Sequence, residues 1–175
     1  MVLARLILGL LCLSPMTGYE LKKHFDSSIN HFWNADKAQI YRTLAQLVDK
    51  GYATVRTVPQ SNYPDRQEHH ITPEGRQALR QWLGDGVARG TERDPFMGQV
   101  FFAAELEREE IQDLLATRRD QTQSTLDDYL SQREGIDMRA AADRRSFLMA
   151  ATLDHAIRQQ VAEIEWLDAV MEYLP

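Results

Sequence analysis

The chain has 175 residues, 43% of them hydrophobic, and its 20 Lys and Arg against 26 Asp and Glu give a formal net charge of −6 at pH 7. This length and composition suit one core with an appended helical domain, and they exclude a repeat or low-complexity protein. The acidic balance excludes nucleic-acid binding through the overall field, so any such binding requires a local basic surface.

The N-terminal segment predicts two helices. Residues 1–13 are apolar apart from Arg5, which indicates a helix buried on most of its surface and ended by the Ser-Pro pair that follows. Thr17 and Glu20 have the spacing of a capping box, in which each side chain accepts a hydrogen bond from the other residue's backbone N–H. A second helix is therefore expected over about residues 17–30.

A third helix is expected to be capped by Asn34 and to end at Gly51, which suits the left-handed position after a helix. An apolar stripe carries it along one face: Ile40, Leu44, Leu47 and Val48. The opposite face holds Ala38, Gln39, Arg42, Ala45 and Gln46. Such a face is ordinary for a solvated helix, but it also suits a DNA major groove, where Arg reads guanine, Gln reads adenine and alanine permits close approach.

A β-hairpin and a fourth helix follow. Residues 52–58 are rich in β-branched side chains, and a polar Pro/Asn/Ser loop separates them from a second strand at 67–71. Thr72 then provides a capping hydroxyl, with proline at the next position, for a helix that runs to about Leu83. Its expected buried side chains are Leu79, Trp82 and Leu83.

The C-terminal half is predicted to be all helical. After a glycine-containing linker at 84–91, helices are expected over about 96–105, 107–133 and 139–174. The last helix carries apolar residues at three- and four-residue spacing: Phe147, Ala150, Leu153, Ile157, Val161, Ile164, Leu167 and Met171. Two interpretations stay open, in which this stripe packs on the preceding long helix of the same chain or forms a homodimer interface.

The order of helix, turn, helix, hairpin and helix is typical of a winged helix-turn-helix. Several segments also carry a family likeness: Leu-Gly-Leu-Leu near the start, Gly-Tyr-Glu-Leu-Lys-Lys at 18–23, Phe-Trp at 32–33, Gln-Ile-Tyr-Arg-Thr-Leu at 39–44 and Thr-Pro-Glu-Gly-Arg at 72–76. With these segments the chain resembles the PadR family of bacterial transcriptional regulators. Residues 93–96, 101–103 and 165–167 resemble the helical C-terminal domain of one branch of that family.

The resemblance implies a mainly α fold with a small β-hairpin, made of a winged helix-turn-helix domain over 1–84 and a helical dimerisation domain over 93–175. It implies a homodimer that binds a pseudo-palindromic operator in double-stranded DNA, as a repressor rather than an enzyme. The predicted DNA contacts are Lys23, Lys37, Ala38, Gln39, Tyr41, Arg42 and Arg66. The predicted dimer contacts are Leu153, Ile157, Val161, Ile164, Leu167 and Met171.

One departure from the family pattern concerns the wing. Relatives carry several basic residues there, whereas Arg66 is followed here by Gln67, Glu68, His69 and His70. With the acidic balance, this motivates an alternative function, a winged-helix protein-interaction module with little affinity for DNA. The resemblance also implies a small aromatic or hydrophobic effector, for which Trp33, Phe101 and Trp166 are candidate pocket residues.

Charge divides between the two halves. Residues 1–84 carry ten Lys and Arg and seven Asp and Glu, a net of +3, whereas residues 85–175 carry ten and nineteen, a net of −9. DNA binding is therefore expected from the first half. No cofactor, metal site or membrane segment is predicted, and the single cysteine together with the absence of a signal-peptide cleavage pattern after residue 13 favours a cytoplasmic location.

Overall fold

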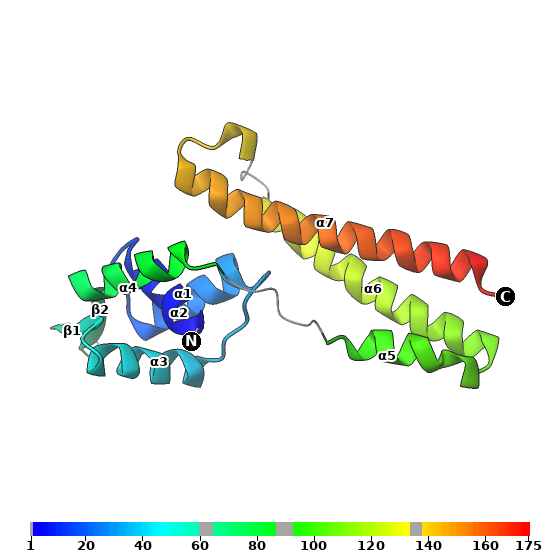
Figure 1. Ribbon diagram of the computed structural model, residues 1–175, viewed down its shortest axis with the longest axis horizontal. Helices are drawn as coiled ribbons and strands as arrows, with labels where there is room; N and C mark the ends of the chain where they lie inside the picture. The colour runs from blue at the N-terminus through cyan, green and yellow to red at the C-terminus, as the bar shows by residue number, and fades with distance from the viewer. Residues whose placement is uncertain (1, 60–64, 87–92, 134–137) are drawn as a thin grey trace. The chain divides into compact units, whose positions relative to one another are not determined.

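The computed structural model describes residues 2–59, 65–86, 93–133 and 138–175 (Figure 1). The chain divides into two compact units, Met1–Arg89 and Gly90–Pro175. Residues 87–91 of the predicted linker, and residues 60–64 of the predicted hairpin loop, lie outside the described residues. The first unit contains α1 (Val2–Leu11), α2 (Gly18–His24), a π-helical turn (Phe25–Ile29), α3 (Lys37–Asp49), β1 (Ala53–Val58), β2 (Arg66–Ile71) and α4 (Pro73–Gly84).

Local capping explains where the helices of the first unit begin. The Thr17 hydroxyl accepts from the Glu20 backbone N–H at 3.1 Å, and the Glu20 carboxylate accepts from the Thr17 N–H at 2.8 Å, as the capping box predicts. The cap expected at Asn34 is wrong, because Asp36 caps α3 instead. Asp36 and Gln39 form a second reciprocal capping box, an arrangement that Asn34 with Lys37 three residues later cannot make.

The hairpin is antiparallel, with Ala53 opposite Ile71 and Val58 opposite Arg66. Met16 forms an isolated antiparallel bridge with His69 of β2. The backbone N–H of Met16 donates to the carbonyl of His69 at 3.2 Å, and the carbonyl of Met16 accepts from the His69 N–H at 2.8 Å. The connection between α1 and α2 is thereby tied to the wing. Gly51, at φ 71°, supplies the expected left-handed turn between α3 and β1.

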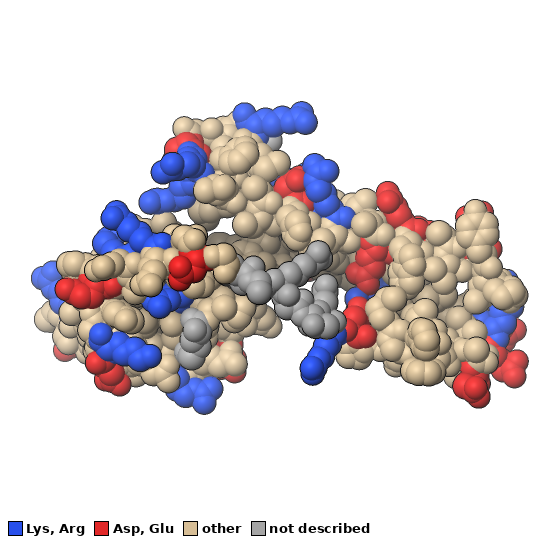
Figure 2. Space-filling model, viewed as in Figure 1, with Lys and Arg blue, Asp and Glu red and all other residues tan. Residues whose placement is uncertain are grey.

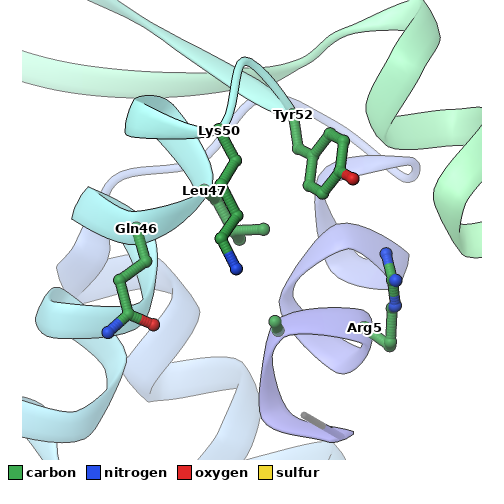
Figure 3. A pocket seen from close by; sticks show the side chains of 6 residues that line it. Arg5, Gln46, Leu47, Lys50 and Tyr52 are labelled. Carbon is green, nitrogen blue, oxygen red and sulfur yellow. The ribbon is translucent and has the colours of Figure 1, made fainter.

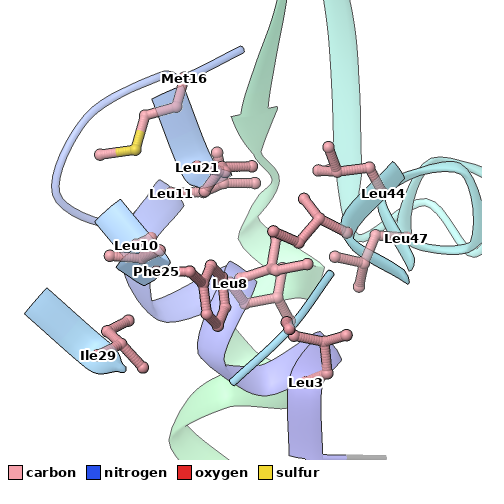
Figure 4. Packing of buried hydrophobic residues seen from close by; sticks show 14 of the residues in the cluster. Leu3, Leu8, Leu10, Leu11, Met16, Leu21, Phe25, Ile29, Leu44 and Leu47 are labelled. Carbon is pink, nitrogen blue, oxygen red and sulfur yellow. The ribbon is translucent and has the colours of Figure 1, made fainter. Parts of the chain in front are cut away.

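The core of the first unit is enclosed by all of its helices. Figure 4 shows leucines of α1 packed between Phe25 and Ile29 on one side and Leu44 and Leu47 of α3 on the other. Leu79 of α4 also joins this core, and Trp82 packs against it. Leu83, predicted to be buried with them, is 67% exposed.

The second unit contains α5 (Pro95–Phe102), a 3₁₀ turn (Ala103–Glu105), α6 (Arg108–Arg133), a second 3₁₀ turn (Met138–Ala140) and α7 (Arg144–Tyr173). The two long helices lie side by side in antiparallel directions (Figure 1). At one end, the guanidinium of Arg108 donates to the carbonyl of Leu174 at 2.7 Å. Further along, Arg118 pairs with Glu163 at 2.7 Å.

The apolar stripe of α7 packs mainly against α5 and α6 of the same chain. Leu167 and Met171 pack in a cluster with Phe96 of α5 and Leu115 of α6. A second cluster joins Leu153, Ile157 and Ile164 to Leu126 and Tyr129 of α6. Of the six predicted contacts only Val161 is exposed, at 38%. Helical spacing predicted that this stripe is buried, but it could not tell an intrachain partner from a second copy.

Candidate nucleic-acid interface

One face of α3 presents its polar side chains to solvent. Lys37, Ala38, Gln39, Tyr41 and Arg42 are all exposed, whereas the apolar residues of the opposite face lie in the core. The helix is 13 residues long, or about 20 Å at 1.5 Å per residue. A helix of this size with one exposed polar face fits the width of a major groove.

Gln39 has a structural role beside its predicted reading role. The side-chain oxygen of Gln39 accepts from the Asp36 backbone N–H at 3.1 Å, and the backbone N–H of Gln39 donates to the Asp36 carboxylate at 2.7 Å. The side-chain oxygen is therefore engaged by the cap, while the side-chain NH₂ donates no hydrogen bond within the described residues. In this arrangement Gln39 offers hydrogen-bond donors to a ligand.

Tyr41 is held against the start of α2. Its ring packs directly on Gly18, where a Cβ would come within 2.7 Å of the ring carbon Cζ. The Lys37 ammonium lies 5.8 Å from the centre of the same ring. Gly18 thus permits the close approach that sets the position of Tyr41 and, through it, of Lys37.

We expect Gly18→Ala to displace the Tyr41 ring and to weaken DNA binding several-fold with little change in stability. The added methyl overlaps the far end of an exposed side chain, which can swing away at small cost. Fluorescence anisotropy with duplex DNA and thermal unfolding measure the two effects separately. The single variant Tyr41→Phe is compared with Gly18→Ala to separate loss of the Tyr41 hydroxyl from displacement of its ring. If Gly18→Ala binds DNA with unchanged affinity, Gly18 does not position Tyr41 for DNA binding.

Arg42 lies beside an open cleft of about 480 Å³ on the same side of α3. The cleft is lined by Val2, Leu3, Trp33, Asn34, Gln39, Arg42, Thr43 and Gln46. Arg42 is exposed and forms no ion pair within the described residues. Its guanidinium is therefore available to an external acceptor.

Arg66 differs from Arg42 because it is already paired. Its guanidinium lies 3.2 Å from Glu20 and 2.8 Å from Glu68, and it is half-buried between α2 and the wing. The backbone N–H of Thr17, and then Arg66, hold the pKa of Glu20 below its usual range. Lys23, the remaining predicted contact, is exposed on α2. No local pattern in the sequence predicts the pairing of Arg66 with Glu20, which lies 46 positions away.

Two histidines of the first unit make its stability depend on pH. Burial lowers the pKa of His31 and, with the adjacent His70, that of His69, below the ordinary 6.5. The unfolded chain then binds protons more readily than the folded chain. The two neutral histidines therefore contribute fully to the free energy of unfolding above about pH 6.5, and this contribution is lost as the pH falls. We expect a smaller free energy of unfolding at pH 5.5 than at pH 7.5 in denaturant titrations. The double change His31→Asn with His69→Asn should flatten this dependence, and an equally steep curve in that variant contradicts the assignment.

The three candidate effector residues do not form one cluster within either unit. Trp33 belongs to the first unit, where it packs against the core beside α1. In the second unit, Trp166 packs edge-on against Phe96 with ring centres 6.4 Å apart. Phe101 is 80% exposed and contacts Phe102. Trp166 lines an open groove of about 960 Å³ with Arg118 and Glu163, whereas Phe101 does not.

The surface charge follows the division seen in the sequence. On the face shown in Figure 2, blue Lys and Arg side chains are spread over the first unit among a few red ones, while red Asp and Glu side chains gather on the second unit where α6 and α7 lie. Blue side chains also mark the beginning of α7. Among the described residues, no group of three or more His, Cys, Asp or Glu side chains is arranged to hold a metal ion. None of the helices in the described ranges is both long and apolar enough to cross a membrane.

Comparisons with known proteins agree with this architecture. The model of the transcriptional regulator PadR-like family matches residues 7–81, and that of the virulence activator alpha C-terminal domain matches residues 92–174. The negative transcriptional regulator PadR of Bacillus subtilis is 30% identical over 176 aligned residues, which cover 97% of this chain and 96% of the relative.

Solved structures of that relative have the same fold. The crystal structure of Bacillus subtilis PadR in complex with operator DNA matches with a TM-score of 0.91 and 27% identity, over 100% of both chains. The crystal structure of the same protein in complex with p-coumaric acid matches with a TM-score of 0.84 and 26% identity, over 98% of both chains. The likeness therefore spans both units.

Proposed function

Because the chain belongs to the PadR-like family of transcriptional regulators, which bind DNA and are not enzymes, we propose that it is a sequence-specific repressor that acts as a homodimer in the cytoplasm. The observation that carries the proposal is the exposed face of α3, with Arg42 free of ion pairs among the described residues. The operator complex of a relative with the same fold supports it, as does that relative's description as a negative regulator.

The residues of this face take different roles in the proposal. Arg42 reads a guanine edge and Gln39 donates to a base acceptor, while Ala38 permits close approach. Lys23, Lys37 and Tyr41 hold the phosphate backbone, which fixes the register of the protein on the duplex.

Arg66 contributes to DNA binding less directly. Its pairing with Glu20 and Glu68 offsets its charge, so it holds the wing against α2 and contacts phosphate only at the cost of those ion pairs. Its main proposed role is therefore to orient the hairpin.

The proposed homodimer is supported by apolar side chains that the single chain leaves exposed. Phe147, Leu148 and Met149 at the start of α7 are 46%, 57% and 49% exposed, and Val161 lies on the same helix. Consecutive exposed apolar residues of this size are unusual on a monomer. Light scattering at micromolar concentration should give twice the chain mass, and a monomer there contradicts the homodimer.

The proposed effector is a small aromatic compound that lowers the affinity for DNA. The complex of the Bacillus relative with p-coumaric acid supports this class, and the groove beside Trp166 offers an aromatic wall next to the cation of Arg118. p-Coumaric acid is the first compound to test. Release of operator DNA by it should be weakened in Trp166→Ala and retained in Phe101→Ala, which changes an aromatic residue outside the groove.

The decisive experiment is fluorescence anisotropy of the purified protein with duplex DNA from upstream of its own gene, beside a scrambled duplex, at two salt concentrations. We expect nanomolar binding to the first duplex and much weaker binding to the scrambled duplex. The affinity for the scrambled duplex should depend only weakly on salt, because the chain is acidic overall. Equal, weak binding to both duplexes and to tiled fragments of the surrounding DNA contradicts the regulator function and favours a protein-interaction module.

A further inference from the structure

A small pocket lies between α1, the end of α3 and the start of β1, and the proposed function assigns it no role. Its walls come from Ala4, Arg5, Gln46, Leu47, Lys50 and Tyr52. Figure 3 shows Lys50 extending from the end of α3 toward α1, and Arg5 on α1 with its guanidinium directed toward Tyr52. Two cations from distant positions in the sequence therefore share one depression.

Arg5 is unusual in its own helix. It is the single charged residue of α1, which otherwise reads Val-Leu-Ala, then Leu-Ile-Leu-Gly-Leu-Leu, and it is half-buried. Its guanidinium carbon lies 5.9 Å from the centre of the Tyr52 ring, which holds the side chain along the pocket wall. A charge on so apolar a helix needs a compensating interaction, and the ring face supplies only part of one.

The pocket has no acidic counterpart. No Asp or Glu is among the residues that line it, and neither Arg5 nor Lys50 forms an ion pair within the described part of the chain. By contrast, Arg66, Arg118, Arg119 and Arg158 are all paired with carboxylates. Two uncompensated cations, a carboxamide and a phenol make a site for an anion with several oxygen atoms.

The volume of the pocket limits which ligands it can hold. The pocket has a volume of about 80 Å³, which is that of two or three water molecules at roughly 30 Å³ each. Cavities for drug-sized ligands measure about 300–1,000 Å³, so an aromatic effector does not fit. A single tetrahedral oxyanion does. We propose that this pocket, formed by Arg5, Lys50, Gln46 and Tyr52, binds a phosphate group.

The phosphate group has two sources with the same chemistry, the DNA backbone and a free phosphate ion. Gln46 lines both this pocket and the cleft that contains Arg42 and Gln39, so the pocket continues the face of α3 assigned to DNA. This continuity favours a backbone phosphate next to the major-groove contact, an argument that rests on the proposed function. A free phosphate ion requires only the pocket itself.

The DNA arm compares wild-type protein with Arg5→Gln plus Lys50→Gln, using anisotropy on the operator duplex across a salt series. Loss of one phosphate contact should weaken binding about tenfold and lower the slope of log K against log salt by about 0.9. The control is Arg76→Gln plus Arg80→Gln, which removes the same charge from two exposed positions on α4 and should leave the slope unchanged. Circular dichroism checks that each variant is folded.

The free-ion arm measures thermal unfolding of the same three proteins in inorganic phosphate and in chloride at equal ionic strength. A bound ion raises the unfolding midpoint of the wild type and of the α4 control more than that of the pocket variant. A changed DNA slope identifies the backbone as the source, and a phosphate-specific stabilisation identifies the free ion. The proposal is overturned if the pocket variant matches the control in both arms. If wild-type protein binds no duplex specifically but phosphate still stabilises it through the pocket, the DNA function fails and the site stands.

Discussion

Arg42→Ala is expected to reduce the preference of the protein for its operator over a scrambled duplex by about one to two orders of magnitude. Arg42 projects from the exposed face of α3 and has no ion pair within the described residues, so nothing in the protein competes for its guanidinium. A bidentate contact to guanine contributes about 1–3 kcal/mol of discrimination, which corresponds to roughly 5- to 150-fold in Kd. Anisotropy with both duplexes at constant salt measures this loss.

The matched control for Arg42→Ala is Arg80→Ala. Arg80 is exposed on α4, which lies on a different side of the first unit from α3 (Figure 1), and its removal changes the net charge equally. We expect Arg80→Ala to weaken binding to both duplexes slightly and to keep the preference. If Arg42→Ala weakens binding to both duplexes by the same factor, Arg42 contacts phosphate and the base-reading role belongs elsewhere on α3.

Gly75→Ala is expected to be the most destabilising single methyl addition in the first unit. A Cβ at Gly75 would overlap the backbone carbonyl of Tyr52, which also accepts a hydrogen bond from the Thr72 N–H at 3.1 Å, and would lie 3.0 Å from Ile71. Backbone cannot swing aside as a side chain can, so α4 must move off the start of β1. We expect a loss of at least about 2 kcal/mol and a fall of roughly 10 °C in the unfolding midpoint.

Gly84→Ala supplies the control on the same helix. Gly84 ends α4 and has no atom within 4 Å of an added Cβ, so alanine there should be neutral or slightly stabilising through its better helix propensity. Chemical denaturation of both variants, followed by circular dichroism, tests the pair. Equal stability of Gly75→Ala and the wild type would show that α4 is not held against Tyr52 in solution.

The sequence predicts the parts of this fold that short-range chemistry decides. The Thr17–Glu20 capping box, the positive φ of Gly51 and the Thr72 cap each depend on residues within a few positions, and each is confirmed. The cap predicted at Asn34 is wrong, although Asp36 and Gln39 already carry the spacing of a capping box in the sequence.

Contacts between distant positions could not be read from the pattern. The pairing of Arg66 with Glu20 joins the wing to α2, and the need for glycine at 75 comes from the carbonyl of Tyr52, which lies on another element. Helical spacing predicts a buried stripe on α7, and the structure adds that α6 of the same chain covers most of it. Periodicity shows which face is buried and carries no information on what covers it.

The second capping box constrains how the specificity of this regulator can change during evolution. Gln39 stabilises the start of α3 through its side-chain oxygen, so a substitution that alters base preference at this position also alters the stability of the reading helix. Glutamate would preserve the cap and place a negative charge against the groove, whereas lysine or arginine would offer new base contacts and lose the cap. New operator preferences are therefore easier to reach by substitution of Arg42, which does not cap α3, than by substitution of Gln39.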